Sequence, residues 1–262
     1  MRVRYFQINA FTSSTFGGNP AGVCVLEHWL SDELLSRIAA ENKLSETAFF
    51  TREGDSFHLR WFTPTMEVDL CGHATLATAH VLFSELGQKG NRVKFKTRSG
   101  ALGAEKRRDY LELDFPARPP APCPTPDKLV RALRRRPKEV LKSRDYVAVF
   151  DSAAEVAAVT PDMDMVSKLD CLGVIVTAKS DTADFVSRFF APQAGVPEDP
   201  VTGSAHCSLI PFWAERLGKE ELFARQISRR GGELFCRNLG DRVGIGGRAA
   251  VYLRGELEIG WP

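Results

Sequence analysis

Two short segments of this 262-residue chain combine a glycine with side chains that can transfer protons or bind substrate. The first is Cys71-Gly72-His73, and the second is Gly203-Ser204. A glycine that begins a helix leaves backbone N–H groups free at the positive end of the helix dipole, where an anion binds well. We therefore expect Gly72, Gly203 and Ser204 to bind a substrate carboxylate.

The surroundings of the two glycines also repeat. Arg60-Trp-Phe-Thr-Pro64 precedes the first glycine, and Arg188-Phe-Phe-Ala-Pro192 precedes the second. Leu86-Gly87 stands as far after Gly72 as Leu217-Gly218 stands after Gly203. This shared register predicts an internal duplication. Two similar halves related by a pseudo-twofold axis would place the glycine turns face to face, with a small-molecule site in the cleft between them.

Each glycine is expected to begin a helix enclosed by strands. Residues 72–87 and 203–218 leave little polar face, so neither helix can present a wide surface to solvent. Short β-favouring segments separated by glycine or charged turns surround both. A further helix is expected from Ser31, with Ser31 as its N-cap and one apolar face against the protein. The pattern predicts an α+β fold in which strands wrap one buried helix in each half.

The domain boundary is expected in the proline-rich stretch 116–126, which can form neither a helix nor a central strand. We therefore predict an N-terminal domain over residues 1–118 and a C-terminal domain over residues 119–262, with terminal strands free to exchange between them.

Composition favours a small-molecule partner. The formal net charge of +2 is too near balance to indicate nucleic acid or an anionic membrane. No stretch is apolar for long enough to span a bilayer, and the N-terminus lacks the apolar core of a secretory signal. The six cysteines form no Cys-x-x-Cys pair, which is typical of a protein in a reducing cytoplasm. We interpret His80 and His206, both inside the enclosed helices, as core residues and expect no metal site.

Five motifs together resemble one known family. In chain order they are Gly18-Asn-Pro-Ala-Gly22, Leu44-Ser-Glu-Thr-Ala-Phe49, Arg60-Trp-Phe-Thr-Pro64, Asp69-Leu-Cys-Gly-His-Ala-Thr75 and Glu198-Asp-Pro-Val-Thr-Gly-Ser-Ala205. The chain thus resembles the PhzF-like (phenazine biosynthesis PhzF) family over nearly its whole length. The resemblance implies the diaminopimelate epimerase fold: two similar, mostly antiparallel barrels, each around a central helix. It also implies a cofactor-free site between them and a homodimer.

The same resemblance assigns roles to three residues. The family's general acid/base glutamate maps on Glu46, and its substrate-orienting histidine and aspartate map on His73 and Asp199. The residues fit these roles, because apolar neighbours should raise the pKa of Glu46. The helix dipole should keep His73 neutral and favour Asp199 as an anion. Two alternatives stay open: Asp199 as a helix cap, and Asn19 as a residue of the turn before Pro20 rather than a substrate contact.

The type of reaction is inferred from the absence of a second cysteine that would match Cys71. Cofactor-free racemases of this fold use a cysteine at each helix mouth, but here Thr202 stands where a second cysteine would match Cys71. A hydroxyl is far too weakly acidic for that role, so a two-base epimerase is disfavoured. Glu46 acting alone suits an isomerase that shifts a double bond in a small carboxylated metabolite, with Cys71 beside the substrate. The alternatives are an epimerase that uses Cys71 with a carboxylate, and a non-catalytic binding or scaffold protein.

Overall fold

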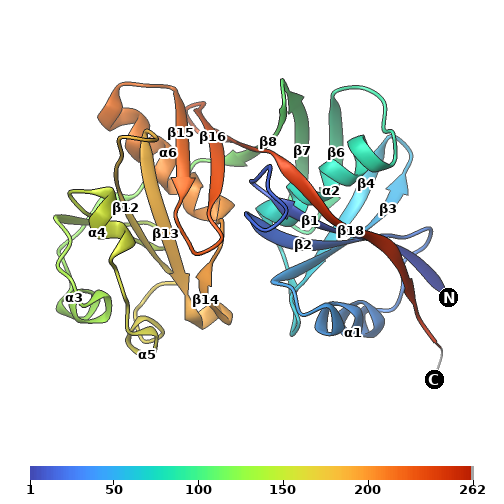
Figure 1. Cartoon of the computed structure of the whole chain (residues 1–262), viewed down its shortest axis with the longest axis horizontal. Helices are drawn as coiled ribbons and strands as arrows, with labels where there is room; N and C mark the ends of the chain where they lie inside the picture. The colour runs from blue at the N-terminus through green and yellow to red at the C-terminus, as the bar shows by residue number, and fades with distance from the viewer. Residues whose placement is uncertain (261–262) are drawn as a thin grey trace. The chain divides into compact units, whose positions relative to one another are not determined.

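The computed structural model describes residues 1–260, which form two compact units. Unit 1 comprises Met1–Asp114 and the segment that begins at Gly246, and unit 2 comprises Phe115–Ile245. In each unit, strands surround one central helix, α2 (Gly72–His80) in unit 1 and α6 (Gly203–Leu217) in unit 2 (Figure 1). The expected α+β architecture is confirmed. No helix within residues 1–260 is long and apolar enough to cross a membrane.

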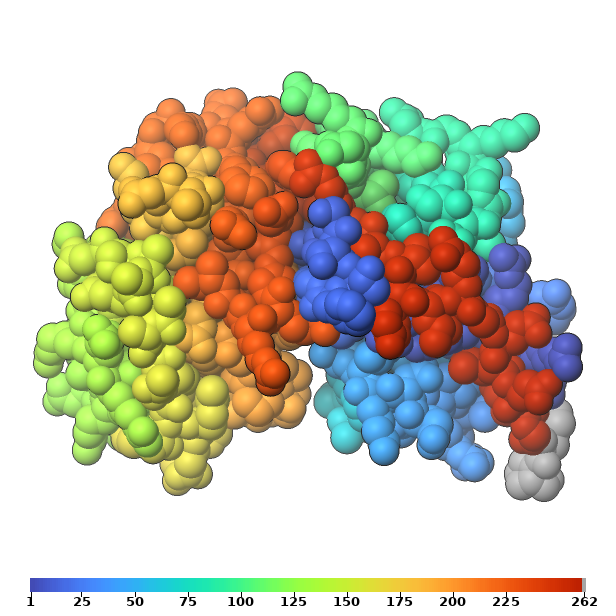
Figure 2. Space-filling view, viewed as in Figure 1, coloured from blue at the N-terminus to red at the C-terminus, as the bar shows by residue number. Residues whose placement is uncertain are grey.

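The C-terminal segment belongs to the N-terminal unit. The sequence predicts one domain over residues 119–262, but the chain from Gly246 on packs with unit 1. The cause is β18 (Ala249–Glu258), which pairs antiparallel with β1 (Arg2–Ala10) from end to end. β18 is the red band across the visible face of Figure 2, where residues 252–256 are exposed. The difference is an exchange of a terminal strand, which the prediction allows; residues 261 and 262 lie outside the described part.

The sheet of unit 1 joins its strands in the order β18, β1, β2, β3, β4, β6, β7, β8, with β5 added beside β4. The β2/β3 and β4/β6 pairs are parallel and the others antiparallel. The remaining bounds are β2 Asn19–Val25, β3 Glu46–Glu53, β4 Ser56–Phe62, β5 Glu67–Val68, β6 Arg92–Thr97, β7 Gly100–Arg107 and β8 Tyr110–Pro116.

The helix α2 fills the centre of unit 1 because its sequence offers no wide polar face. Residues 73–79 are all buried, and the helix packs against β1, β2, β3, β7 and β18. The prediction of one α-helix to residue 87 is wrong in its last turn. The α-helix ends at His80 and continues as a π-helical turn, η1 (Val81–Glu85), in which the Leu86 N–H donates to the Val81 carbonyl at 3.0 Å.

A surface helix, α1 (Asp32–Asn42), begins as the sequence predicts. The Ser31 hydroxyl accepts a hydrogen bond from the Leu34 N–H at 3.3 Å, which satisfies one of the free donors of the first turn. Leu35, Ile38 and Ala39 are buried, so the apolar face covers the sheet of unit 1.

Unit 2 repeats the pairing scheme of unit 1. Its strands join in the order β9, β10, β11, β12, β13, β15, β16, with β14 beside β13, and the β11/β12 and β13/β15 pairs are parallel. The bounds are β9 Ala121–Pro122, β10 Glu139–Lys142, β11 Tyr146–Val149, β12 Val174–Lys179, β13 Phe185–Ala191, β14 Val196–Asp199, β15 Glu221–Gln226, β16 Gly232–Asn238 and β17 Arg242–Gly247. The short helices are α3 Asp127–Leu133, α4 Ala153–Ala157, α5 Met163–Val166 and the 3₁₀ turn η2 Pro192–Ala194.

The correspondence extends to the central helices. Both begin at the predicted glycine, and both are followed by a glycine with positive φ, +66° at Gly87 and +61° at Gly218. The duplication read from the sequence is therefore a duplication of strand order as well as of motifs.

Candidate active site

Four predicted site residues lie together where two adjacent strands of unit 1 begin. Asn19 and Glu46 are the first residues of the adjacent parallel strands β2 and β3, so their side chains lie at the same end of the sheet. Cys71 is the N-cap of α2, and His73 follows in its first turn. The glycine between them, Gly72, brings the backbone of the helix start to the same place.

The imidazole of His73 links the other three side chains. Its Nε2 lies 3.2 Å from Oε2 of Glu46, and its Nδ1 lies 3.3 Å from Nδ2 of Asn19 and 3.5 Å from Sγ of Cys71. Because Nε2 faces a carboxylate, it carries a proton whether the ring is neutral or charged. The carboxylate thus lies beside the imidazole at the helix mouth, and neither Nε2 nor Oε2 makes a well-aligned hydrogen bond within residues 1–260.

The cluster is shielded from solvent. The side chain of His73 is 7% exposed and that of Glu46 is 18% exposed. Burial lowers the pKa of His73, but the charge of Glu46 and the hydrogen bonds of Cys71 and Glu46 raise it, and the resulting pKa lies well above the ordinary value. This shift runs against the expectation of a neutral His73, whereas the amide nitrogen of Asn19 beside Nδ1 fits the neutral ring, because Nδ1 must then accept.

The thiol of Cys71 is held in its protonated form. Burial raises its pKa, and the negative charge of Glu46 raises it further, against a smaller lowering by His73. A protonated thiol can donate a proton or pack as a small apolar group, whereas a nucleophilic role would need a lowered pKa.

One ligand atom each from Glu46, Cys71 and His73 also lie within 4.8 Å of one another. Cysteine, histidine and glutamate are all ligands that zinc accepts. No metal-binding motif is visible in the sequence, because these three donors come together only where the start of β3 packs against the start of α2.

An Arg–Glu ion pair stabilises the segment that precedes each central helix. Arg60 donates through Nε and Nη2 to both carboxylate oxygens of Glu67, at 2.8 and 2.7 Å. In unit 2, Arg188 makes the same two bonds to Glu198, at 2.7 and 3.0 Å. Each glutamate stands shortly before the glycine that begins the helix, at the same spacing in both units. Two-point pairs of this kind fix both partners, so they position the loops that carry Cys71 and its counterpart in unit 2.

In unit 2, the predicted site residues lie at the start of α6. The Thr202 hydroxyl donates to Oδ2 of Asp199 at 2.6 Å, and Thr202 is the N-cap residue of the helix. Gln226, 1% exposed, accepts from the Thr202 N–H at 2.9 Å and donates to the Asp199 carbonyl at 2.7 Å. The Ser204 hydroxyl, next to Gly203, accepts from Arg144 Nη2 at 3.1 Å.

The structure brings the predicted site residues together in two groups and adds supporting residues that were not predicted. Asn19, Glu46, Cys71, Gly72 and His73 lie together in unit 1, and Asp199, Gly203 and Ser204 lie together in unit 2. The missed residues are the Arg–Glu pairs, Gln226 and Arg144. Among these, only the Arg–Glu pairs could have been found from the sequence, because Glu67 and Glu198 stand at the same distance before the two glycines.

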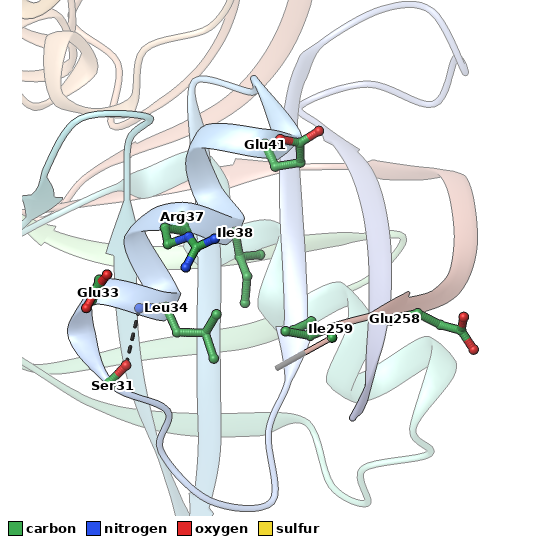
Figure 3. A pocket seen from close by; sticks show the side chains of 9 residues that line it. Ser31, Glu33, Leu34, Arg37, Ile38, Glu41, Glu258 and Ile259 are labelled. Atoms are coloured by element: carbon green, nitrogen blue, oxygen red, sulfur yellow. Dashed lines mark hydrogen bonds between the residues drawn. The ribbon is translucent and has the colours of Figure 1, made fainter. Parts of the chain in front are cut away.

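A hollow elsewhere in unit 1 is a weaker candidate for an anionic substrate. It lies between α1 and the end of β18, where Leu34, Ile38 and Ile259 point toward one another (Figure 3). Three carboxylates, of Glu33, Glu41 and Glu258, line it against one cation, Arg37. Their negative charges repel a carboxylate, so the Glu46 cluster is the candidate site.

Comparison with known proteins shows which family the chain matches. The PhzC-PhzF family, described as phenazine biosynthesis-like protein, matches residues 8–255. The chain belongs to the PhzC-PhzF family. The family resemblance derived from the five motifs is thereby confirmed.

Relatives and solved structures agree with this assignment. An uncharacterized isomerase of Pseudomonas aeruginosa is 52% identical to this PhzC-PhzF protein over 99% of the chain and 100% of the relative. A crystal structure of a PhzF-family protein from Enterococcus faecalis superposes with a TM-score of 0.97 at 46% identity, covering 99% of this chain and 100% of that one. A predicted epimerase from Pseudomonas aeruginosa, 20% identical with a TM-score of 0.74 and covering 98% and 100%, shows the shared fold. The expected epimerase-like fold is confirmed.

Proposed function

We propose that this protein is a cofactor-independent isomerase in which Glu46 moves a proton within a small carboxylated, unsaturated or cyclic metabolite. The observation that carries this proposal is the 3.2 Å contact between Glu46 and the buried His73. Membership of the PhzC-PhzF family and the isomerase name of the Pseudomonas aeruginosa relative support it.

Glu46 has the arrangement that a single acid/base group needs. His73 lies beside Oε2, and Oε1 would take a proton from one carbon and return it to another on the same face of the substrate. Asn19 and Cys71 flank the other side of the imidazole and limit its rotation. Asp199, Gly203 and Ser204 stay predicted substrate contacts, and the homodimer stays a prediction.

The proposal is tested by proton exchange. The protein is incubated in deuterated water with a panel of small unsaturated and cyclic carboxylic acids, and deuterium incorporation is followed by NMR. Glu46→Gln should lower the rate of exchange by about 10³-fold while substrate binding persists. Glu53→Gln is the matched control, because it changes the same residue type on the same strand at an exposed ion pair with Lys96. Full exchange in Glu46→Gln would refute the assignment.

A second candidate is an epimerase in which Cys71 delivers the opposing proton. The contact of 3.5 Å between its thiol and Nδ1 of His73 favours this alternative, because it gives the thiol a proton-transfer partner. Cys71→Ala separates the two reactions. An isomerase that relies on Glu46 should keep its rate within about threefold, whereas an epimerase should lose about 10²-fold or more.

A further inference from the structure

A second cavity of unit 1 lies at the end of the helical segment α2–η1 opposite to His73. Its volume is about 520 Å³, within the range of small-molecule sites. Residues of η1, of the β7–β8 hairpin and of the start of β18 line it. It shares no residue with the Glu46 cluster, so a ligand bound here would not occupy the proposed proton-transfer site.

The cavity carries an excess of positive charge. Lys106 and Arg108 both line it, and neither forms an ion pair with a carboxylate within residues 1–260. Arg248 also lines it but is held by Asp109, whose Oδ2 accepts from Arg248 Nε at 2.8 Å. Two cations therefore remain available to an anion.

The floor of the cavity is apolar. Phe83 and Leu111 are 6% and 8% exposed, and the Lys106 ammonium lies 4.5 Å from the centre of the Phe83 ring. That contact holds the ammonium over an aromatic face at the cavity wall. A ligand that fits must combine a negative charge with a flat or hydrocarbon body, because inorganic anions gain nothing from this floor.

The backbone at Arg108 supports a role for its side chain. Arg107 pairs with Tyr110 across the hairpin, so Arg108 is the first of two loop residues. Its φ of +45° lies in the left-handed region that glycine and asparagine favour at this place in a two-residue hairpin. The turn alone therefore does not favour an arginine at this position.

We infer that this cavity is a second ligand site of the protein and that it binds a small aromatic carboxylate. The carboxylate would lie between Lys106 and Arg108, with the ring against the apolar floor of the cavity.

The test is a protection experiment on the full-length protein with benzoate as the probe. Lysine acetylation by acetic anhydride is followed at each site by mass spectrometry. Saturating benzoate should slow the modification of Lys106 by about fivefold or more and leave the exposed Lys128 of unit 2 unchanged. Equal rates at Lys106 with and without benzoate would overturn the inference, and so would equal protection by inorganic phosphate, because the apolar floor would then play no part.

Two substitutions at one position separate charge from folding. Arg108→Gly suits the positive φ and removes the charge, so it should fold at least as well as the parent and bind benzoate about tenfold more weakly. Arg108→Lys should retain the affinity. Arg134→Gly is the matched control, because Arg134 also has positive φ, +53°, and lies outside the cavity. Unchanged affinity in Arg108→Gly, or an equal loss in Arg134→Gly, would refute the site.

Discussion

Protonation of His206 should destabilise unit 2 in mild acid. His206 lies in the first turns of α6 and is 0% exposed. Its Nδ1 lies 2.8 Å from the Thr202 carbonyl and donates to it, while Nε2 is buried and has no hydrogen-bond partner within residues 1–260. Burial lowers the pKa of His206 to about 4, against a small rise from the bond to Thr202. The positive end of the α6 dipole acts in the same direction as burial.

The sign and size of the effect follow from this pKa. A histidine in an unfolded chain has a pKa of about 6.5. Because the folded state prefers the neutral ring, its contribution to stability is complete above about pH 6.5 and is lost as the pH falls toward about 4. At about 1.4 kcal/mol per pH unit, the loss is about 2 kcal/mol at pH 5 and about 3 kcal/mol at pH 4.

The assay compares urea unfolding at pH 7 and pH 5 for the parent and His206→Thr. Threonine is chosen because Thr75, at the matching place in α2, donates to the Cys71 carbonyl at 2.5 Å. The variant loses some stability at both pH values through the smaller side chain. Its loss between pH 7 and pH 5 should nevertheless be smaller than that of the parent by about 2 kcal/mol.

The contributions of other titrating groups to the pH dependence cancel in this comparison, because the parent and His206→Thr both contain them. His73 is one of them, and its raised pKa acts in the opposite direction: its stabilisation is present below about pH 6.5 and is lost as the pH rises through its folded pKa. An identical pH dependence in the parent and in His206→Thr would refute the account of a buried neutral imidazole.

Two further predictions concern the supports of the fold. Arg188→Met should lower the free energy of unfolding by about 3 kcal/mol, because it leaves the carboxylate of Glu198, 24% exposed, without its partner. The double variant with Glu198→Met should recover part of that loss in urea unfolding, and no recovery would contradict the ion-pair explanation. Gly18→Ala should cost more than about 2 kcal/mol, because its Cβ would lie 2.2 Å from a backbone oxygen, whereas Gly87→Ala, with similar φ and open space, should cost about 1 kcal/mol. Equal melting temperatures of these two glycine variants would refute the steric argument.

The starts of both central helices were predictable because they depend on local chemistry. A glycine followed by small and apolar residues marks a helix that enters a crowded interior, and Gly72 and Gly203 are the first residues of α2 and α6. The end of α2 was not predictable in the same way. Val81–Glu85 reads as a continuing α-helix, and nothing in these residues distinguishes the π-helical turn that the structure contains.

The assembly of the site depended on pairings that the sequence does not display. Asn19 reads as part of a turn, yet it is the first residue of β2 and fully buried, because β2 pairs with both β1 and β3. The contact of Asn19 with His73 joins residues 54 positions apart. Motif spacing could place each residue at a helix mouth or strand end, but only the parallel pairing of β2 and β3 brings Glu46 to the imidazole.

The strand register also explains why the duplication need not make two equivalent acid/base sites. Arg60 lies opposite Phe49 in the β3/β4 pair, and its counterpart Arg188 lies opposite Val176 in the β12/β13 pair. Three residues before Phe49 stands Glu46, whereas three residues before Val176 stands Gly173. A Cβ at Gly173 would lie 2.4 Å from the Phe189 ring, so no carboxylate fits there without moving that ring. Unit 2 thus lacks a counterpart of Glu46 as well as of Cys71, so any acid/base chemistry of these two side chains belongs to unit 1 alone.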